Sequence, residues 1–303
     1  RKALQRPTQG HEPGQTHMNN QLLPGFDPTA EEQVHQTNLA GRIERAVKLL
    51  RDNVPPEGYY LAFSGGKDSC VIKKLADLSG VKYDAHYSQT TVDPPELVRF
   101  IKQHHPDVQW EIPAVNMMTA VANSDAGPPT RFRRWCCRLY KENGGAGRVL
   151  IMGVRAAESR RRANAWKEIT TDIKDSPVVC PIVYWLDDHV WEFIRHYNLP
   201  VCSLYNEGFT RLGCIGCPLA SKTIQAQQFE RWPRFAANWK AAVIKNWENY
   251  RHKKNKDGRP SFQSKFKAGE AFWHWWLNSY WPSDVFRDGC QTGLLWTNDP
   301  DDD

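Results

Sequence analysis

The chain has 303 residues, of which 40% are hydrophobic and 24% are charged, and its formal net charge is +6. This size and composition can bury one large or two modest cores, which excludes an intrinsically disordered protein. No apolar run approaches the about 20 residues that a membrane-spanning helix needs, so we expect no membrane partner. The positive charge favours an anionic ligand but does not by itself indicate nucleic acid.

The first 27 residues are polar and rich in Gln, Pro and His. We expect residues 1–27 to lie outside the fold, as a segment that is disordered or not native to the protein. No positively charged stretch followed by an apolar one has the pattern of a signal peptide, which predicts a cytoplasmic protein. In that compartment the eight cysteines point to metal or redox chemistry before disulfides.

From about residue 28 the pattern becomes helical, and apolar residues at helical spacing between Leu39 and Leu50 predict a helix there. Strand-like and helix-like segments then alternate. Strands are predicted at 59–63, 83–87, 108–112, 149–154 and 178–183, and helices at 68–78, 96–105, 117–123, from 156 onward and at 187–197. This alternation predicts an α/β fold with a doubly wound, mostly parallel sheet, whose ligands bind beyond the carboxyl ends of the strands.

The segment Ser64-Gly65-Gly66-Lys67-Asp68-Ser69 joins the first predicted strand to the helix that follows it. The glycines let the backbone approach a phosphate, and the free N–H groups at the start of the helix point toward it. The spacing is not that of a Walker A loop. A plain Gly-Gly turn with a Ser or Asp helix cap is the alternative interpretation.

This string resembles the PP-loop of the ATP pyrophosphatase and adenine nucleotide α-hydrolase superfamily. The resemblance implies that Ser64, Gly65, Gly66, Lys67, Asp68 and Ser69 bind the phosphates of ATP. It also implies cleavage between the α- and β-phosphates. In this interpretation Lys67 and Asp68 are catalytic, Lys67 as a phosphate clamp and Asp68 as a candidate ligand of Mg²⁺.

The cysteines are unevenly distributed: Cys136 and Cys137 are adjacent, and Cys214 and Cys217 form a C-x-x-C flanked by Gly and Pro. The flanking glycines allow a tight turn that brings two sulfurs to one centre. Two such pairs predict a four-thiolate site, for zinc or an iron–sulfur cluster. Adjacent cysteines suit a cubane better than zinc, because the iron corners of a cubane are separated in space. Two buried free cysteines and a redox dithiol are the alternative.

The order of PP-loop, Cys-Cys and C-x-x-C resembles the phosphoadenosine and adenosine phosphosulfate (PAPS and APS) reductase superfamily, over roughly residues 55–220. The resemblance implies a [4Fe–4S] cluster held by Cys136, Cys137, Cys214 and Cys217. The segment from Gly153 to Arg161 resembles the family's G-x-R-x-x-E-S-x-x-R motif. It implies that Arg155, Arg160 and Arg161 bind the anionic partner and that Arg155 takes part in catalysis. Guanidinium groups suit phosphate or sulfate oxygens.

We therefore expect a PP-loop domain over residues 28–220 and a helical region over 221–303. Helices are predicted near 229–250 and 268–281, in a stretch crowded with tryptophans. Helical spacing favours packing of these rings over base stacking on a nucleic acid. The segment from Lys253 to Gly258 is predicted to be an exposed loop.

The sequence departs from the reductases in two ways. Its PP-loop is complete and carries Lys67, as in family members that consume ATP, such as the small subunit of sulfate adenylyltransferase and the DNA phosphorothioation protein DndC. The reductases also use a cysteine near the C-terminus in a Glu-Cys-Gly-Leu-His context, whereas Cys290 lacks both the Glu and the His. Cys290 is therefore not assigned as catalytic, and Cys70, Cys180 and Cys202 are expected to be packing residues.

Three functions are compatible with these motifs. The favoured one is an enzyme that binds ATP with Mg²⁺, adenylates a substrate and passes sulfur or electrons through the cluster, with a nucleic acid or a sulfur-donor protein as partner. The second is an APS or PAPS reductase that forms sulfite. The third is a protein without catalysis that senses an adenine nucleotide and binds nucleic acid or a partner protein. The sequence leaves the acceptor, the sulfur donor and the oligomeric state open.

Overall fold

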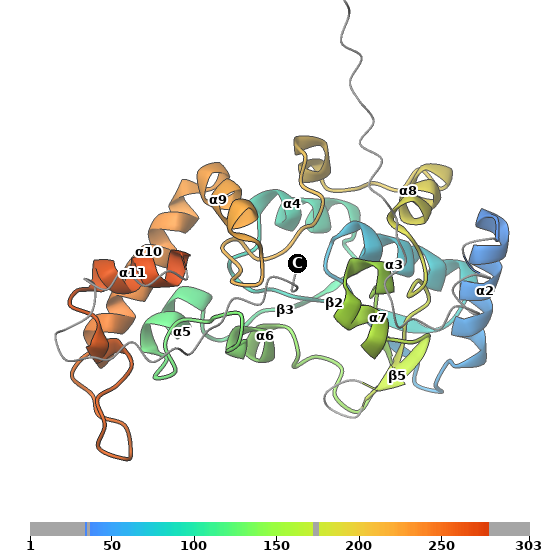
Figure 1. The fold of residues 1–303 in the computed structure, drawn as a ribbon. Helices are drawn as coiled ribbons and strands as arrows, with labels where there is room; N and C mark the ends of the chain where they lie inside the picture. The colour runs from blue at the N-terminus through green and yellow to red at the C-terminus, as the bar shows by residue number, and fades with distance from the viewer. Residues whose placement is uncertain (1–33, 35–36, 172–175, 279–303) are drawn as a thin grey trace, which may run out of the picture.

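A six-stranded sheet forms the centre of the structure, a computed structural model that describes residues 34, 37–171 and 176–278 (Figure 1). The strands lie in the order β3-β2-β1-β4-β6-β5. Neighbouring strands run parallel except β5 and β6, which are antiparallel. The strands are β1 (Tyr59–Ala62), β2 (Tyr83–Ser88), β3 (Gln109–Glu111), β4 (Leu150–Ile151), β5 (Ile169–Thr171) and β6 (Pro177–Val179).

Helices connect the parallel strands, since a parallel pair needs a crossover connection. In Figure 1, α3, α4 and α8 lie above the strands and α5 and α6 lie below them, whereas α7 lies above β5. The predicted α/β fold with a doubly wound, mostly parallel sheet is confirmed. The helices are α2 (Leu39–Asp52), α3 (Lys67–Ser79), α4 (Pro95–His104), α5 (Met117–Asn123), α6 (Trp135–Tyr140), α7 (Arg160–Ala165), α8 (Asp187–His196), α9 (Lys222–Arg231), α10 (Pro233–Tyr250) and α11 (Gly269–Asn278).

The first hydrophobic core packs the sheet against helices that include α2, α3 and α8. Leu61 on β1 is in register with Ala85 on β2, and both are buried in the same core as Ile72 of α3. The hydroxyl of Tyr59 donates a 2.9 Å hydrogen bond to the carbonyl of Leu50 in α2. Each large apolar side chain buried here contributes about 1.5–3 kcal/mol. This packing fixes the end of β1, from which the predicted phosphate loop departs.

Three cysteines, Cys70, Cys180 and Cys202, are buried in this core as free thiols. Burial raises the pKa of Cys70 and of Cys180 to about 12. Thiols of this kind stay protonated and unreactive at neutral pH. The prediction that they are packing residues is confirmed.

The opposite face of β1, β2 and β3 carries a polar network. The Tyr60 hydroxyl donates a 2.7 Å hydrogen bond to Glu111, and the Tyr60 ring stacks on His86 with 4.2 Å between centroids. Arg148, just before β4, donates two hydrogen bonds of 2.7 and 2.5 Å to Asp84, which lower the pKa of that carboxyl. Hydrogen bonds and ion pairs therefore supplement ring packing on this part of the sheet.

The tryptophans of the C-terminal helices form a second core, which they share with α5. Trp239 and Trp276 stack at 4.9 Å and are buried, as are Trp247 and Trp273. The indole N–H groups donate to backbone carbonyls: Trp239 to Ile215 at 2.9 Å, and Trp276 at 2.7 Å to a loop carbonyl before α6. Buried rings with satisfied N–H groups cannot stack on bases, so the packing interpretation is confirmed for these residues. Trp281 lies outside the described residues.

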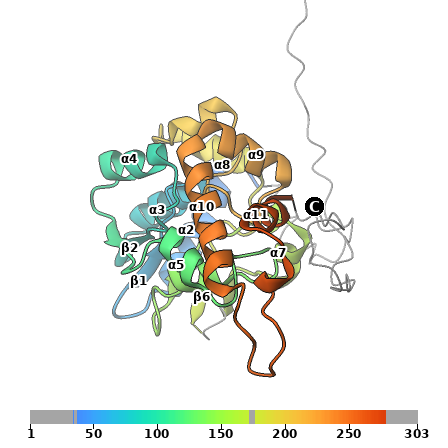
Figure 2. The same cartoon turned by 90° about the vertical axis from the view of Figure 1, so that its left-hand side faces the viewer.

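Asn246 ties α10 to the end of α5. Its side chain is fully buried and donates hydrogen bonds to the carbonyls of Val121 and Ser124, at 2.8 and 2.7 Å. Beyond α10, residues 251–260 project from the body as a hairpin-like loop, visible from both sides in Figures 1 and 2. An antiparallel bridge joins Lys254 to Pro260, and residues 252–260 are exposed, as predicted.

Several element boundaries differ from the sequence predictions. The helix predicted at 229–250 is two helices, α9 and α10, which meet at Trp232 because Pro233 cannot continue the hydrogen bonding of α9. The helix expected from Ala156 is a short 3₁₀ turn, Ala156–Glu158, followed by α7. Helix α6 and the edge strand β5 are not among the predicted elements.

Two of the sequence predictions concern the ends of the chain. The predicted N-terminal segment 1–27 and Cys290 lie outside the described residues. Within the described part of the chain, no helix combines the length and the apolar character that crossing a bilayer requires.

Candidate functional site

The S-G-G-K-D-S segment is a strand–loop–helix turn, as its residue types predict. Gly65 has a φ of +73°, and a Cβ there would lie 2.8 Å from side-chain atoms of Ile101 and Leu97, so no larger residue fits. Ser69 donates a 2.8 Å hydrogen bond from its hydroxyl to the carbonyl of Gly66. Helix α3 begins at Lys67, so its first N–H groups face the loop as an anion site requires.

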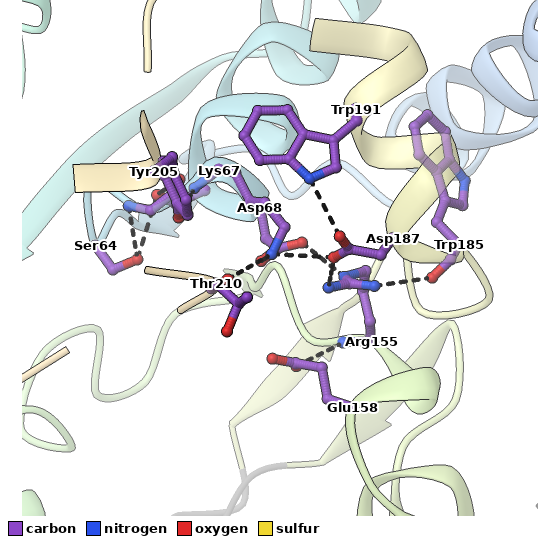
Figure 3. Close-up of polar contacts among 12 residues, drawn as sticks. Ser64, Lys67, Asp68, Arg155, Glu158, Trp185, Asp187, Trp191, Tyr205 and Thr210 are labelled. Carbon is purple, nitrogen blue, oxygen red and sulfur yellow. Dashed lines mark hydrogen bonds and ion pairs between the residues drawn. The ribbon is translucent and has the colours of Figure 1, made fainter. Parts of the chain in front are cut away.

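Lys67 is buried, and both of its donor groups have partners (Figure 3). Its ammonium lies 3.1 Å from Asp187 Oδ1 and donates a 3.3 Å hydrogen bond to the carbonyl of Thr210. Asp68 Oδ2 lies 3.8 Å from the same ammonium. The backbone N–H of Lys67 donates a 2.8 Å hydrogen bond to the hydroxyl of Tyr205. Asp187, Tyr205 and Thr210 are contacts that the sequence analysis did not identify.

Arg155 connects the loop to α8. Its Nε donates a 2.6 Å hydrogen bond to Asp68 Oδ1, and its Nη2 donates a 2.9 Å hydrogen bond to Asp187 Oδ1. Its Nη1 lies 3.5 Å from the carbonyl of Trp185. All three guanidinium nitrogens have protein partners. Without a ligand, Arg155 therefore holds Asp68 and Asp187 in place. Its assignment as an anion ligand stays a prediction.

The other predicted arginines, Arg160 and Arg161, lie exposed in the first turn of α7. The next residue, Arg162, is half-buried and forms an ion pair with Glu158. Burial and the nearby guanidinium of Arg211 lower the pKa of Arg162 to about 10. The sequence analysis missed Arg162, although the i,i+4 spacing from Glu158 is a recognisable signal.

The same interactions show that these cations form a group. Besides Arg211, the charges that act on Arg162 include Arg155, Arg134 and Asp68. Arg134 in turn lies against the thiol of Cys137.

Both cysteine pairs border the second core, against which Cys136 and Cys214 pack. Cys136 and Cys137 lie in the first turn of α6, and Cys214 and Cys217 bracket a tight turn before α9, where the N–H of Cys217 donates to the carbonyl of Cys214 at 3.3 Å. A hydrogen bond between the neighbouring thiols lowers the pKa of Cys137 to about 6 and raises that of Cys136. Cys214 and Cys217 also contribute to raising the pKa of Cys136.

The surroundings of the cysteines suit an anionic group. Proximity to Cys214, and to Cys217, raises the pKa of Lys141, the residue after α6, although burial opposes it. Although burial opposes it, a hydrogen bond with Cys137 raises the pKa of Arg134. Thr90 Oγ1 lies 3.5 Å from the Sγ of Cys214. Cations and hydroxyls around thiolates are what an iron–sulfur cluster with a net negative charge needs.

Zinc fits this site less well. Among the described residues, no three Cys, His, Asp or Glu side chains converge to hold one metal ion. Zinc needs four ligands within about 2.3 Å of a single centre, whereas each thiolate of a cubane binds its own iron. The donor set thus fits a [4Fe–4S] cluster better than zinc, and both the cluster and its ligands stay predictions.

Gly216, between the two cysteines of the C-x-x-C turn, has a φ of +73°, and a Cβ there would lie 2.8 Å from Phe229 and from Trp239 Nε1. We expect Gly216→Ala to lower the free energy of unfolding by about 2–4 kcal/mol, through backbone strain and overpacking together. Urea unfolding measures this loss. Gly258→Ala is the control, because Gly258 has a φ of +79° with nothing within 4 Å, and should cost only about 1 kcal/mol. Equal losses would contradict the steric argument.

Residues 58–220 match the model of the phosphoadenosine phosphosulfate reductase domain. The chain belongs to this family. The match contains the phosphate loop, Arg155 and all four cysteines. Membership of the family confirms the resemblance at that level and does not extend to the DndC-like branch.

Several known proteins resemble the chain over part of its length. The chain is 27% identical over 173 residues to an adenosine 5'-phosphosulfate reductase of Staphylococcus haemolyticus, covering 54% of this chain and 69% of the relative. It is 27% identical over 220 residues to an uncharacterised protein of Methanocaldococcus jannaschii, covering 68% of this chain and 44% of the relative. A crystal structure of phosphoadenylyl-sulfate reductase from Candida auris superposes with a TM-score of 0.44 at 15% identity, covering 59% of this chain and 95% of that one.

Proposed function

We propose that the chain is an ATP-dependent enzyme that adenylates an acceptor and supports sulfur transfer at a [4Fe–4S] cluster, in the manner of the DndC-like branch of the family. The observation that carries this proposal is Lys67, an ammonium buried at the start of α3 in a complete PP-loop. A cation at this position neutralises the charge that develops on departing pyrophosphate. An enzyme whose substrate arrives already adenylated has no such need.

In the proposed reaction an acceptor oxygen attacks the α-phosphorus of ATP, and the bond to the bridging oxygen of the β-phosphate breaks. The hydroxyls of Ser64 and Ser69 and the first N–H groups of α3 would hold the phosphates. Asp68 uses Oδ1 for Arg155, which leaves Oδ2 for the Mg²⁺ that accompanies ATP. One or two carboxylates plus phosphates suffice for this ion.

Sulfur transfer would follow at the neighbouring cysteines. Cys136, Cys137, Cys214 and Cys217 would hold the cluster, which supplies redox and sulfur-transfer chemistry when bound. A hydrosulfide donor would displace AMP from the adenylated acceptor, so that the oxygen leaves with AMP and sulfur takes its place. Arg162 and Arg211, together with the exposed Arg160 and Arg161, would bind an anionic acceptor, and a nucleic acid backbone is the acceptor that we favour.

The test uses protein purified without oxygen, MgATP and two acceptors, a DNA duplex and sulfate. Formation of AMP and pyrophosphate in equal amounts, dependent on one acceptor, supports the proposal. Absence of both AMP formation and bound iron with acid-labile sulfide would overturn it.

The second candidate is an adenylyl-sulfate reductase, which the similarity to the Staphylococcus haemolyticus enzyme favours. It predicts sulfite and AMP from adenylyl sulfate without ATP. In that reaction a thiol would attack the sulfur and two electrons from a dithiol reductant would complete the release of sulfite. Cys290 is the nearest match in the sequence to such a thiol, and undiminished sulfite formation by Cys290→Ser would discard this route.

A further inference from the structure

The donors of Lys67 that would bind phosphate are already satisfied by groups from outside the loop. The ammonium is 3.1 Å from Asp187 Oδ1, and the backbone N–H bonds to the hydroxyl of Tyr205 at 2.8 Å. Asp187 begins α8, and Tyr205 lies in the 3₁₀ helix Ser203–Glu207. A carboxylate oxygen and a phenol oxygen thus occupy the two positions where the loop would meet oxygens of a phosphate (Figure 3).

Charge explains why the free protein needs Asp187 there. The side chains of Lys67 and Arg155 are only 6% and 5% exposed, and Oδ1 of Asp187 serves both. A buried cation is costly without a counter-ion. Once a polyphosphate supplies negative charge, the same carboxylate becomes repulsive. Asp187 differs from the cations in being 51% exposed, so it can turn into water at little cost.

The two occupying groups are also joined to each other. The indole N–H of Trp191 donates a 3.1 Å hydrogen bond to Asp187 Oδ2. The ring of Trp191 packs edge-on against Tyr205, with 5.4 Å between centroids. Trp191 therefore links the two groups, and displacement of one loosens the support of the other.

We propose that Asp187 and Tyr205 stand in for phosphate oxygens in the free protein and are displaced by the phosphates of the nucleotide. The inference rests on the proposed ATP site and adds to it the residues that set its affinity. Asp187 acts as an exchangeable counter-ion of Lys67 and Arg155, and Tyr205 as an exchangeable acceptor for the first N–H of α3.

The test is calorimetric titration of the purified full chain with MgATP and, separately, with inorganic pyrophosphate. Asp187→Asn removes the competing charge and should bind both ligands about tenfold more tightly, the gain expected from loss of one partly exposed ion pair. Tyr205→Phe removes only one oxygen and should tighten binding about threefold. If Asp187 merely positions Lys67, Asp187→Asn would instead weaken binding, and unchanged or weaker binding overturns the inference.

Asp188→Asn is the matched control, because it makes the same charge change in the same turn of α8. Among the described residues, Asp188 forms no ion pair with Lys67 or Arg155. The affinity of Asp188→Asn for both ligands should equal that of the unmodified protein, and a gain in affinity equal to that of Asp187→Asn would overturn the inference.

Tighter pyrophosphate binding by Asp187→Asn with no MgATP binding would support the inference and reject the nucleotide assignment. MgATP binding that Asp187→Asn fails to strengthen would reject only the inference, and no binding of either ligand by any variant rejects both.

Discussion

Replacing Lys67 by methionine is expected to slow the formation of AMP and pyrophosphate by about a hundredfold to a thousandfold. Methionine keeps the length of the buried stem and removes the ammonium, which lies among Asp187, Asp68 and the carbonyl of Thr210. In the proposed reaction the Lys67 ammonium, at the first residue of α3, is the cation that neutralises pyrophosphate as it departs. Rates at saturating MgATP and acceptor measure the effect on the chemical step.

Lys73→Met is the matched control for this change. Lys73 lies on the same helix and pairs with Asp107 at 2.9 Å, away from the loop. We expect its rate to stay within about twofold of the unmodified protein, since a pair of this kind contributes little to stability. Full activity of Lys67→Met, or equal losses in both variants, would show that the loop lysine has no special role.

Replacing Cys214 by alanine should remove the cluster. A cubane contains four irons and needs four ligands, so the iron content of anaerobically purified protein should fall from about four to below about one per chain. Absorbance near 400 nm should fall with it. Cys214 is a decisive position because it shifts the pKa values of both Cys136 and Lys141.

Cys202→Ala controls for the loss of a thiol as such. Cys202 is fully buried in the first core, so its removal should leave the iron content unchanged, at a cost in stability typical of a small cavity. Iron retained in Cys214→Ala, or lost equally in Cys202→Ala, would contradict the proposed ligand set.

The phosphate loop could be predicted from sequence because the information is local. A strand of buried residues, two glycines and a helix start are contiguous, and Gly65 needs its left-handed φ whatever surrounds it. The cysteine pairs could be recognised for a similar reason, since their close spacing in the sequence is typical of ligands to a shared centre. The proximity of α6 to the turn before α9 depends on the tertiary structure. The family resemblance implied this proximity, whereas the residues alone did not.

The interaction partners of the predicted site residues could not be predicted from local sequence. Asp187 is 120 positions from Lys67 and Tyr205 is 138 positions from it, and nothing in a helix N-terminus or a 3₁₀ turn marks such a contact. Arg155 was predicted as an anion ligand from its motif, while its contacts with Trp185 and Asp187 depend on how α8 lies against the sheet.

Other features that the sequence analysis did not identify left weak signals in the sequence. The polar network on β2 is one: polar and apolar residues alternate along this strand, with Asp84, His86 and Ser88 on one face, which is the pattern of a strand with one polar side. Helix α6 has six residues and β5 has three, too few for periodicity to reveal. The split at Pro233 was foreseeable, because proline commonly begins a helix.

The cysteine-bearing segments meet where the two cores adjoin: Cys136 and Cys214 pack against the second core, whereas Ile215 is buried in the first. The two pairs are separated in the chain by β4, β6 and α8, so they can approach only after the sheet has assembled. On the proposed ligand set, iron would therefore be inserted after folding, unlike in a zinc finger, whose metal organises an otherwise unstructured chain. The maturation machinery of the cell would meet an already shaped apoprotein with its thiols prearranged.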